Sequence, residues 1–322
     1  MSMNLHGIHH VTAVSARIGD NADFFTRVLG LRLVKKSVNQ DDTSAYHLFY
    51  ADKIGSPGTD MTFFDWPVPA ESRGTDSIVN TAFRVNGTDA LTYWIERFDA
   101  ENVPHQGIET FDGRSVIHFE DFEGQRMMLV DDGGAAYEGE AWEGAGVPAE
   151  HAIRGFYAVT LSIPKLAWLE PVLTKVLNFV ESRRATLPDG TEAVIYDMDG
   201  GGPGKEVWVI VEPDKPAARQ GAGAVHHVAF RVHDDDEEKQ WDNRIRSFGV
   251  PTSGYVDRFY FHSIYFRVSN GILFELATDG PGFATDEDAD KLGERLALPP
   301  FLEHRREQIE RGLKPIVVPS QS

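Results

Sequence analysis

A fourfold internal repeat constrains the fold of this chain more than any other feature of its sequence. Four short segments resemble one another as β-strands: IHHVTAV from Ile8, VNTAFRV from Val79, FYAVTLS from Phe156 and VHHVAFRV from Val225. Their alignment gives one equivalent position, which holds His10, Asn80, Ala158 and His227. Self-similarity along a chain is the signature of repeated supersecondary units. We therefore expect four copies of one structural unit.

Each opening strand is followed by a segment in which apolar residues recur at helical spacing. The expected helices begin near Asp20 or Asn21, span residues 89–100 and 166–177, and follow the acidic run Asp234–Glu238. About three short runs with β-like alternation and β-branched or aromatic residues come after each helix. The repeated unit is therefore βαβββ, and the predicted fold class is α+β.

The length of 322 residues is too great for an ordinary single core, so two domains are expected. Pairing the copies in chain order gives an N-terminal domain over residues 1–140 and a C-terminal domain over 150–280. The segment Asp131–Glu150 between them is rich in Gly and Glu, as linkers are. Residues 281–322 form a tail with a short helix over Leu298–Leu313, interpreted as a packing arm. A lid or a contact within a homo-oligomer is the alternative.

The charge and the residue usage exclude several classes of function. The net charge of −19 argues against a nucleic-acid partner and against an anionic membrane surface, because both require basic patches. The absence of cysteine excludes disulfides and thiolate metal ligands, so any metal must be held by His and carboxylates. The N-terminus lacks the pattern of a signal peptide and no long apolar run occurs, which predicts a cytoplasmic protein.

Comparison of the copies indicates a metal site. The interval from Asn80 to Met128 is 48 residues, and the interval from His227 to Glu275 is also 48. A glutamate thus replaces a methionine within the apolar run ILFELA, where a carboxylate is costly unless it is paired or binds a metal. The opening position carries His only in copies one and four. We therefore expect one metal site built from His10, His227 and Glu275.

Two imidazoles and one carboxylate form a facial triad that leaves coordination positions open, as in non-haem Fe(II) oxygenases. Mn(II) and Zn(II) also fit these ligands. The alternative is that the histidines are satisfied core residues and that the glutamate pairs with an arginine. Each of the two predicted ligand histidines directly follows another His, namely His9 and His226. Of these, His226 could reach the pocket as a proton carrier, and His9 is interpreted as structural, as are His47 and His262.

Several strings of the sequence resemble the vicinal oxygen chelate superfamily, and within it the hydroquinone-type ring-cleaving dioxygenases. They are HGIHHVTAV, KKSVNQDD, YHLFYAD, VHHVAFRV, DRFYFHSIYFR, GILFELATD and the C-terminal LPPFLEHRREQIE. The resemblance implies two vicinal oxygen chelate domains, each a pair of βαβββ modules, with mixed curved sheets forming an open, barrel-like cup. It also implies Fe(II) at the predicted triad and supporting roles for Thr12, His226, Arg258 and Tyr265.

The expected reaction is ring cleavage of a hydroquinone-like or related dihydroxylated aromatic by O₂. In this hypothesis His226 is the acid–base, Tyr265 donates a hydrogen bond to bound oxygen, and Arg258 stabilises developing negative charge. Two other functions stay open. One is a glyoxalase-like lyase or isomerase that uses Zn(II) or Ni(II), and the other is a non-catalytic protein that sequesters small molecules.

Overall fold

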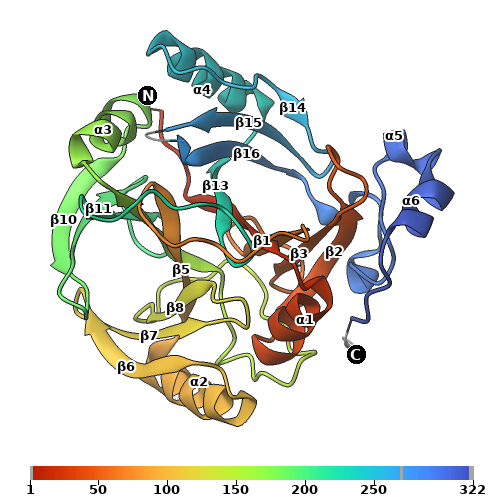
Figure 1. The fold of residues 1–322 in the computed structure, drawn as a ribbon, viewed down its shortest axis with the longest axis horizontal. Helices are drawn as coiled ribbons and strands as arrows, with labels where there is room; N and C mark the ends of the chain where they lie inside the picture. The colour runs from red at the N-terminus through yellow and green to blue at the C-terminus, as the bar shows by residue number, and fades with distance from the viewer. Residues whose placement is uncertain (1–2, 269–270, 319–322) are drawn as a thin grey trace.

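Two eight-stranded mixed sheets form the framework of the protein (Figure 1). The structure, a computed structural model, describes residues 3–268 and 271–318. Residues 1–2 and 319–322, the outer ends of the predicted N-terminal domain and of the tail, lie outside the described residues. No helix within the described ranges is long and apolar enough to cross a membrane. The cytoplasmic location stays a prediction.

The four copies of βαβββ are present in the predicted order. Their opening strands are β1 (Ile8–Ser15), β5 (Ser77–Val85), β9 (Phe156–Ile163) and β13 (Val225–Val232). The later strands are β2 (Arg32–Val38), β3 (Tyr46–Ala51), β4 (Asp60–Asp65), β6 (His105–Phe111), β7 (Arg114–Glu120), β8 (Arg126–Asp131), β10 (Val180–Thr186), β11 (Glu192–Asp197), β12 (Glu206–Val211), β14 (Val256–Asp257), β15 (Phe261–Arg267) and β16 (Leu273–Pro281). The α+β prediction is confirmed.

One helical segment lies in each copy, toward the periphery of the molecule (Figure 1). These are α1 (Ile18–Asp23) continued by the π-helical turn η1 (Phe24–Val28), α2 (Gly87–Glu101), α3 (Leu166–Pro171) continued by η2 (Val172–Val176), and α4 (Asp235–Ser247). The first helix begins before the predicted Asp20 or Asn21. Asn21 does not cap it, because this side chain is buried and accepts a hydrogen bond from the Tyr50 hydroxyl at 2.9 Å.

The sheets join copies that are not neighbours in the chain. One sheet has the strand order β14-β15-β16-β13-β1-β4-β3-β2, and the other has β10-β11-β12-β9-β5-β8-β7-β6. Copies one and four share the first sheet because β1 pairs antiparallel with β13, and copies two and three share the second through β5 and β9. This differs from the chain-order pairing predicted above. The boundaries at residues 140 and 150 stay a prediction.

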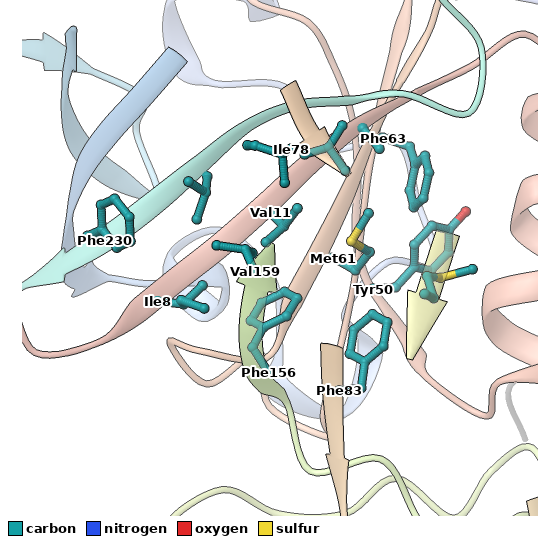
Figure 2. Packing of buried hydrophobic residues seen from close by; sticks show 14 of the residues in the cluster. Ile8, Val11, Tyr50, Met61, Phe63, Ile78, Phe83, Phe156, Val159 and Phe230 are labelled. Atoms are coloured by element: carbon teal, nitrogen blue, oxygen red, sulfur yellow. The ribbon is translucent and has the colours of Figure 1, made fainter. Parts of the chain in front are cut away.

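Buried apolar side chains from both sheets form one continuous cluster. Figure 2 shows Val11, Phe83, Phe156, Val159 and Phe230 packed together in it. A second cluster lies on the sheet formed by copies two and three, which we call the inner-copy sheet, and it includes Met128, Ala158 and Trp208. Copies one and four are the outer copies, and their shared sheet is the outer-copy sheet. Met128 and Ala158 occupy positions where the outer copies carry a carboxylate or an imidazole. Two of the three places equivalent to the predicted site are therefore apolar in this sheet, and the third holds Asn80 in place of His227.

The tail packs against β2. Its elements are η4 (Phe283–Thr285), η5 (Ala289–Lys291), α5 (Pro300–Glu303) and α6 (Arg306–Gly312), so two short helices replace the single one expected. The backbone N–H of Ala297 donates to the Lys36 carbonyl at 2.9 Å, and Leu292 is buried. At Gly293 the fit is close, because an added Cβ would lie 1.9 Å from the Leu33 carbonyl oxygen. These contacts fix residues 283–298 over the edge of the outer-copy sheet.

The start of α4 provides a test of helix capping. The Asp234 carboxylate accepts hydrogen bonds from the backbone N–H groups of Asp236 and Glu237 at 3.0 and 2.9 Å. Because an N-cap of this kind contributes about 1 kcal/mol, we expect Asp234→Ala to lower the free energy of unfolding by that amount. Chemical denaturation measures the change. Asp236→Ala, at an exposed first-turn position, is the control and should have a smaller effect; equal effects would contradict the capping role.

Candidate metal centre and its pocket

Three side chains from the outer copies converge at one point. The Nε2 atoms of His10 and His227 lie 3.3 Å apart, and Oε2 of Glu275 lies 3.2 Å from the first and 2.9 Å from the second. All three side chains are at most 5% exposed. These residues form a group that could hold a metal ion. The structure thus brings together the three residues that the sequence predicts as ligands.

The register of three adjacent strands explains this convergence. In the sheet, β13 lies between β1 and β16. His10 is opposite Ala229 of β13, and Ala229 is in turn opposite Glu275, so these two ligands flank a small residue in one row. His227 comes from the next row of the same face, opposite Thr12. Paired residues on adjacent strands project from the same face of a sheet, which directs all three side chains toward one space.

The geometry of these atoms fits a metal ion better than a set of hydrogen bonds. Among the described residues, Oε2 of Glu275 is buried and has no hydrogen-bond partner of acceptable geometry, although both imidazoles lie close to it. Ligands at about 2.1 Å from one ion and at right angles are about 3.0 Å from each other. The three observed separations of 2.9–3.3 Å are close to that value. The donor set therefore fits a divalent ion in a facial arrangement.

The carboxylate is held in its ionised form. Burial opposes the ionisation of Glu275, but the contacts with His10 and His227 hold its pKa well below the usual range. The second oxygen, Oε1, accepts a hydrogen bond from the Ser263 hydroxyl at 2.6 Å. This bond fixes the carboxylate plane and leaves Oε2 directed at the imidazoles. An ionised, oriented carboxylate is the form that a metal ion requires.

His9 and His226 contact the Nδ1 atoms of the two predicted ligand histidines, on the side of each ring away from the candidate site. His9 Nε2 lies 3.1 Å from the Thr278 carbonyl oxygen and must donate to it, so His9 Nδ1 accepts from His10 Nδ1 at 2.9 Å. This tautomer places a lone pair on His10 Nε2, toward the candidate site. The same Nδ1–Nδ1 contact joins His226 to His227 at 2.8 Å. Burial, followed by the adjacent ligand imidazole, lowers the pKa of His9 and of His226 to about 3.

The acid–base role of His226 stays a prediction, and its position also allows a role in orienting His227. His226 lines a different cavity, together with Asp76 and Arg267, and its ring contacts His227 and also Phe64 of the pocket wall. We expect His226→Ala to weaken metal binding by about 10–100-fold, the usual effect of removing a partner behind a ligand. Competition with a chelator measures this affinity, and His233→Ala, at an exposed His of the same copy, is the control. Unchanged metal affinity with lost turnover would favour the acid–base role instead.

A pocket opens beside the three converging atoms. It is lined by side chains of copies one and four, including Thr12, His47, Arg258, Tyr265 and Phe261. Three of the residues predicted for catalysis therefore lie in its wall. Arg258 Nε donates to the Tyr265 hydroxyl at 3.1 Å, and the Tyr265 ring lies edge-on to His227 at 6.0 Å between centroids. Burial and then Glu275 raise the pKa of Tyr265, so its hydroxyl stays protonated at neutral pH.

The structure adds residues that the sequence analysis missed. The Thr12 hydroxyl contacts the Thr62 hydroxyl at 2.8 Å, and Thr62 contacts His47 Nε2 at 3.0 Å, which makes a polar row along the wall. His47, interpreted as structural from the sequence, thus belongs to the pocket, and burial holds its pKa well below the usual range. Ser263 shares a face with Tyr265 through strand alternation, a signal that was present in the sequence. The partner of Thr12 depends on register and gave no such signal.

Comparison with known proteins places the chain in a family. The profile of the Glyoxalase/Bleomycin resistance protein/Dioxygenase superfamily matches residues 7–129. A Bacillus subtilis protein named as a ring-cleaving dioxygenase, MhqA, is 48% identical over 316 residues, which cover 98% of this chain and 100% of the relative. The chain belongs to this superfamily. Its members include the chlorohydroquinone/hydroquinone 1,2-dioxygenase of Sphingobium indicum, which is 30% identical over 98% of both chains.

Solved structures of the superfamily agree with the observed fold. A crystal structure of a Bacillus subtilis protein described as a dioxygenase superposes with a TM-score of 0.88 at 35% identity, over 98% of this chain and 99% of that one. Glyoxalase I from Zea mays superposes with a TM-score of 0.62 at 13% identity, over 85% of this chain and 92% of that one. The second likeness shows the fold alone. The predicted membership in the vicinal oxygen chelate superfamily is confirmed.

Proposed function

We propose that this protein is a ring-cleaving dioxygenase that holds Fe(II) through His10, His227 and Glu275. The observation that carries the proposal is the convergence of these three side chains beside a pocket lined by polar and aromatic groups. The names of the relatives, ring-cleaving and hydroquinone dioxygenases, support the same class of reaction. A divalent ion held there supplies Lewis acidity and open coordination positions, where a phenolate and dioxygen can meet.

The protein's own residues bind and orient the aromatic ring. Arg258 offers a fixed positive charge in the pocket wall, which favours the phenolate form of a bound ring. Tyr265, with its proton retained, can donate a hydrogen bond on the side of His227. Phe261 and Phe64 provide apolar walls that exclude water. In this proposal His226 orients His227 rather than transferring a proton to the substrate.

The size of the pocket favours a small substrate. Its volume is about 50 Å³, and it lies between aromatic side chains and the polar groups of Ser37, Asn39 and Arg258. A single ring that extends toward solvent fits this space better than a fused or two-ring system. A dihydroxylated ring has one hydroxyl available near the three converging atoms and a second one for the polar wall. We therefore propose a hydroquinone-like substrate with small substituents.

Oxygen consumption tests the proposed function. The protein is reconstituted with Fe(II) under anaerobic conditions and then mixed with hydroquinone or methylhydroquinone in aerated buffer. The proposal predicts oxygen uptake and a new near-ultraviolet absorption from a ring-opened product. Turnover of a methylglyoxal–glutathione adduct with Zn(II) and without oxygen uptake would support a lyase instead. Tight binding of the aromatic without metal or turnover would support sequestration.

A further inference from the structure

The backbone that carries Arg258 is held in an unfavourable conformation. The next residue, Phe259, has φ of 72°, in the left-handed region that residues with a Cβ rarely adopt. Within the turn, the Phe259 N–H donates to the Asp257 carboxylate at 2.7 Å and the Arg258 N–H donates to the Phe261 carbonyl at 3.0 Å. A strained turn persists only where its surroundings hold it, so the contacts from outside the turn matter for the position of Arg258.

One such contact comes from the opposite end of the chain. In the loop between β2 and β3, the Gln40 amide Nε2 donates to the Arg258 carbonyl oxygen at 2.8 Å, and this bond is partly buried. The neighbouring Asp41 carboxylate lies 3.2 Å from Nη1 of Arg258, but its side chain is 78% exposed. An ion pair with so much exposure contributes little, because water screens it. Gln40 therefore provides the stronger tie between copy one and this turn.

The loop that presents Gln40 is braced by its own hydrogen bonds. The Asn39 side-chain oxygen accepts from the backbone N–H groups of Asp41 and Asp42 at 2.8 and 3.1 Å. The backbone N–H of Asn39 also donates to the Ala45 carbonyl at 2.9 Å, which closes the loop. Because these bonds hold the loop, the backbone of Gln40 has a fixed position from which its side chain extends. Asn39, Gln40 and Asp41 all line the pocket, so the loop and the Arg258 turn meet across it.

We propose that residues 39–45 act as a clamp on the Arg258 turn, with Gln40 as a positioning residue for substrate binding. Gln40 acts through the backbone of Arg258, so it sets where the guanidinium lies in the pocket rather than touching the reacting atoms. This inference rests on the proposed function, because it assigns Arg258 to the binding of the aromatic ring. Small displacements of a group that binds substrate are costly, so the loss of this one hydrogen bond should have a measurable effect on substrate binding.

The substitution Gln40→Glu tests the clamp. The substitution keeps the size of the side chain and removes the N–H donor. It also places a carboxylate next to the Arg258 carbonyl oxygen, and the two oxygens repel each other. We expect hydroquinone to bind about tenfold more weakly to the Fe(II)-loaded protein under anaerobic calorimetry, as expected for the loss of one good hydrogen bond. In turnover we expect KM to rise while kcat changes less. Gln106→Glu, the same exchange at an exposed position on β6, should leave both unchanged.

Two further measurements separate positioning from a general structural effect. In an Arg258→Ala background the Gln40 bond to the backbone remains possible, but we expect Gln40→Glu to cause no further loss of hydroquinone binding. In the metal-free protein we expect the backbone amides of the Arg258 turn to exchange with deuterium about tenfold faster in Gln40→Glu, because the clamp is released. Undiminished hydroquinone binding in Gln40→Glu, or an equal loss in the Arg258→Ala background, would overturn the positioning role.

The exchange measurement also distinguishes this inference from the proposed function. If the wild-type protein bound no dihydroxylated aromatic, the proposed function would be wrong. Unchanged deuterium exchange in Gln40→Glu would instead show that Gln40 does not hold the turn, whatever the substrate. Each result thus contradicts one of the two claims by itself.

Discussion

Replacing Glu275 with alanine is expected to abolish tight metal binding and, with it, oxygen uptake. The carboxylate is fully buried, is held ionised by the two imidazoles and is the one acidic member of the group. Loss of a partner behind a ligand already costs about 10–100-fold, so loss of the ligand itself should lower Fe(II) affinity and turnover by more than about a hundredfold. Elemental analysis after gel filtration and an oxygen electrode measure the two effects.

A buried carboxylate in the other sheet provides the matched control. Glu206 is 2% exposed, pairs with Arg183 at 2.9 Å and accepts from the Trp208 indole at 2.8 Å. We expect Glu206→Gln to lower stability while metal content and activity per folded protein stay near those of the wild type. If Glu275→Ala retained a full complement of tightly bound Fe(II), the assignment of this residue as a ligand would be wrong.

The second large effect is expected at Lys35, whose side chain joins strand β2 to the tail. Its side chain is fully buried, and Nζ contacts Asp286 at 2.7 Å and also Glu287. Lys35→Met keeps much of the volume but removes the buried cation of Glu287, which is left with the mostly exposed Arg295 at 3.5 Å from its other oxygen. Breaking a buried pair from one side costs about 3–5 kcal/mol, and we expect a loss of about 3 kcal/mol in the free energy of unfolding, since Asp286 is partly exposed.

The adjacent lysine offers the control for this experiment. Within residues 3–268 and 271–318, the hydrogen bond of Lys36 Nζ goes to an uncharged acceptor, the Glu294 carbonyl oxygen, at 3.1 Å. We expect Lys36→Met to change stability by less than about 1 kcal/mol, because no buried charge is left unpaired. Combining Lys35→Met with Glu287→Gln should recover part of the lost stability, since the unpaired charge is then removed. Equal losses in Lys35→Met and Lys36→Met would contradict the role of the buried pair.

The repeat made the fold and the convergence of the three candidate ligands predictable from the sequence. Four aligned strands gave the βαβββ unit, and each unit folded as expected because its helix and strands are encoded locally by apolar spacing. The exchange of Met128 for Glu275 at equal distance from the opening strand singled out one carboxylate among 50 acidic residues. His10 and His227 followed from the same alignment. Local pattern and internal comparison were sufficient for these three residues.

The features that depend on pairing between distant strands were not predictable in this way. Copies one and four share a sheet because β1 and β13 form a ladder, which no local pattern specifies. The bond from Gln40 to Arg258 joins these two copies. The contact of Thr12 with Thr62 depends in turn on the register of β1 against β4, and local pattern does not specify that register either. The contact of the His226 ring with Nδ1 of His227 also depends on side-chain geometry that the sequence does not specify, and the acid–base role of His226 stays a prediction.

Isotope labelling tests the central claim most directly. The Fe(II)-loaded protein is supplied with hydroquinone and doubly labelled dioxygen, and the product is analysed by mass spectrometry. If an ion held by His10, His227 and Glu275 brings the ring and dioxygen together, the ring-opened product carries both labelled atoms and its yield equals the oxygen consumed. A product without label, or with labelled water as the only labelled species, would contradict the dioxygenase assignment.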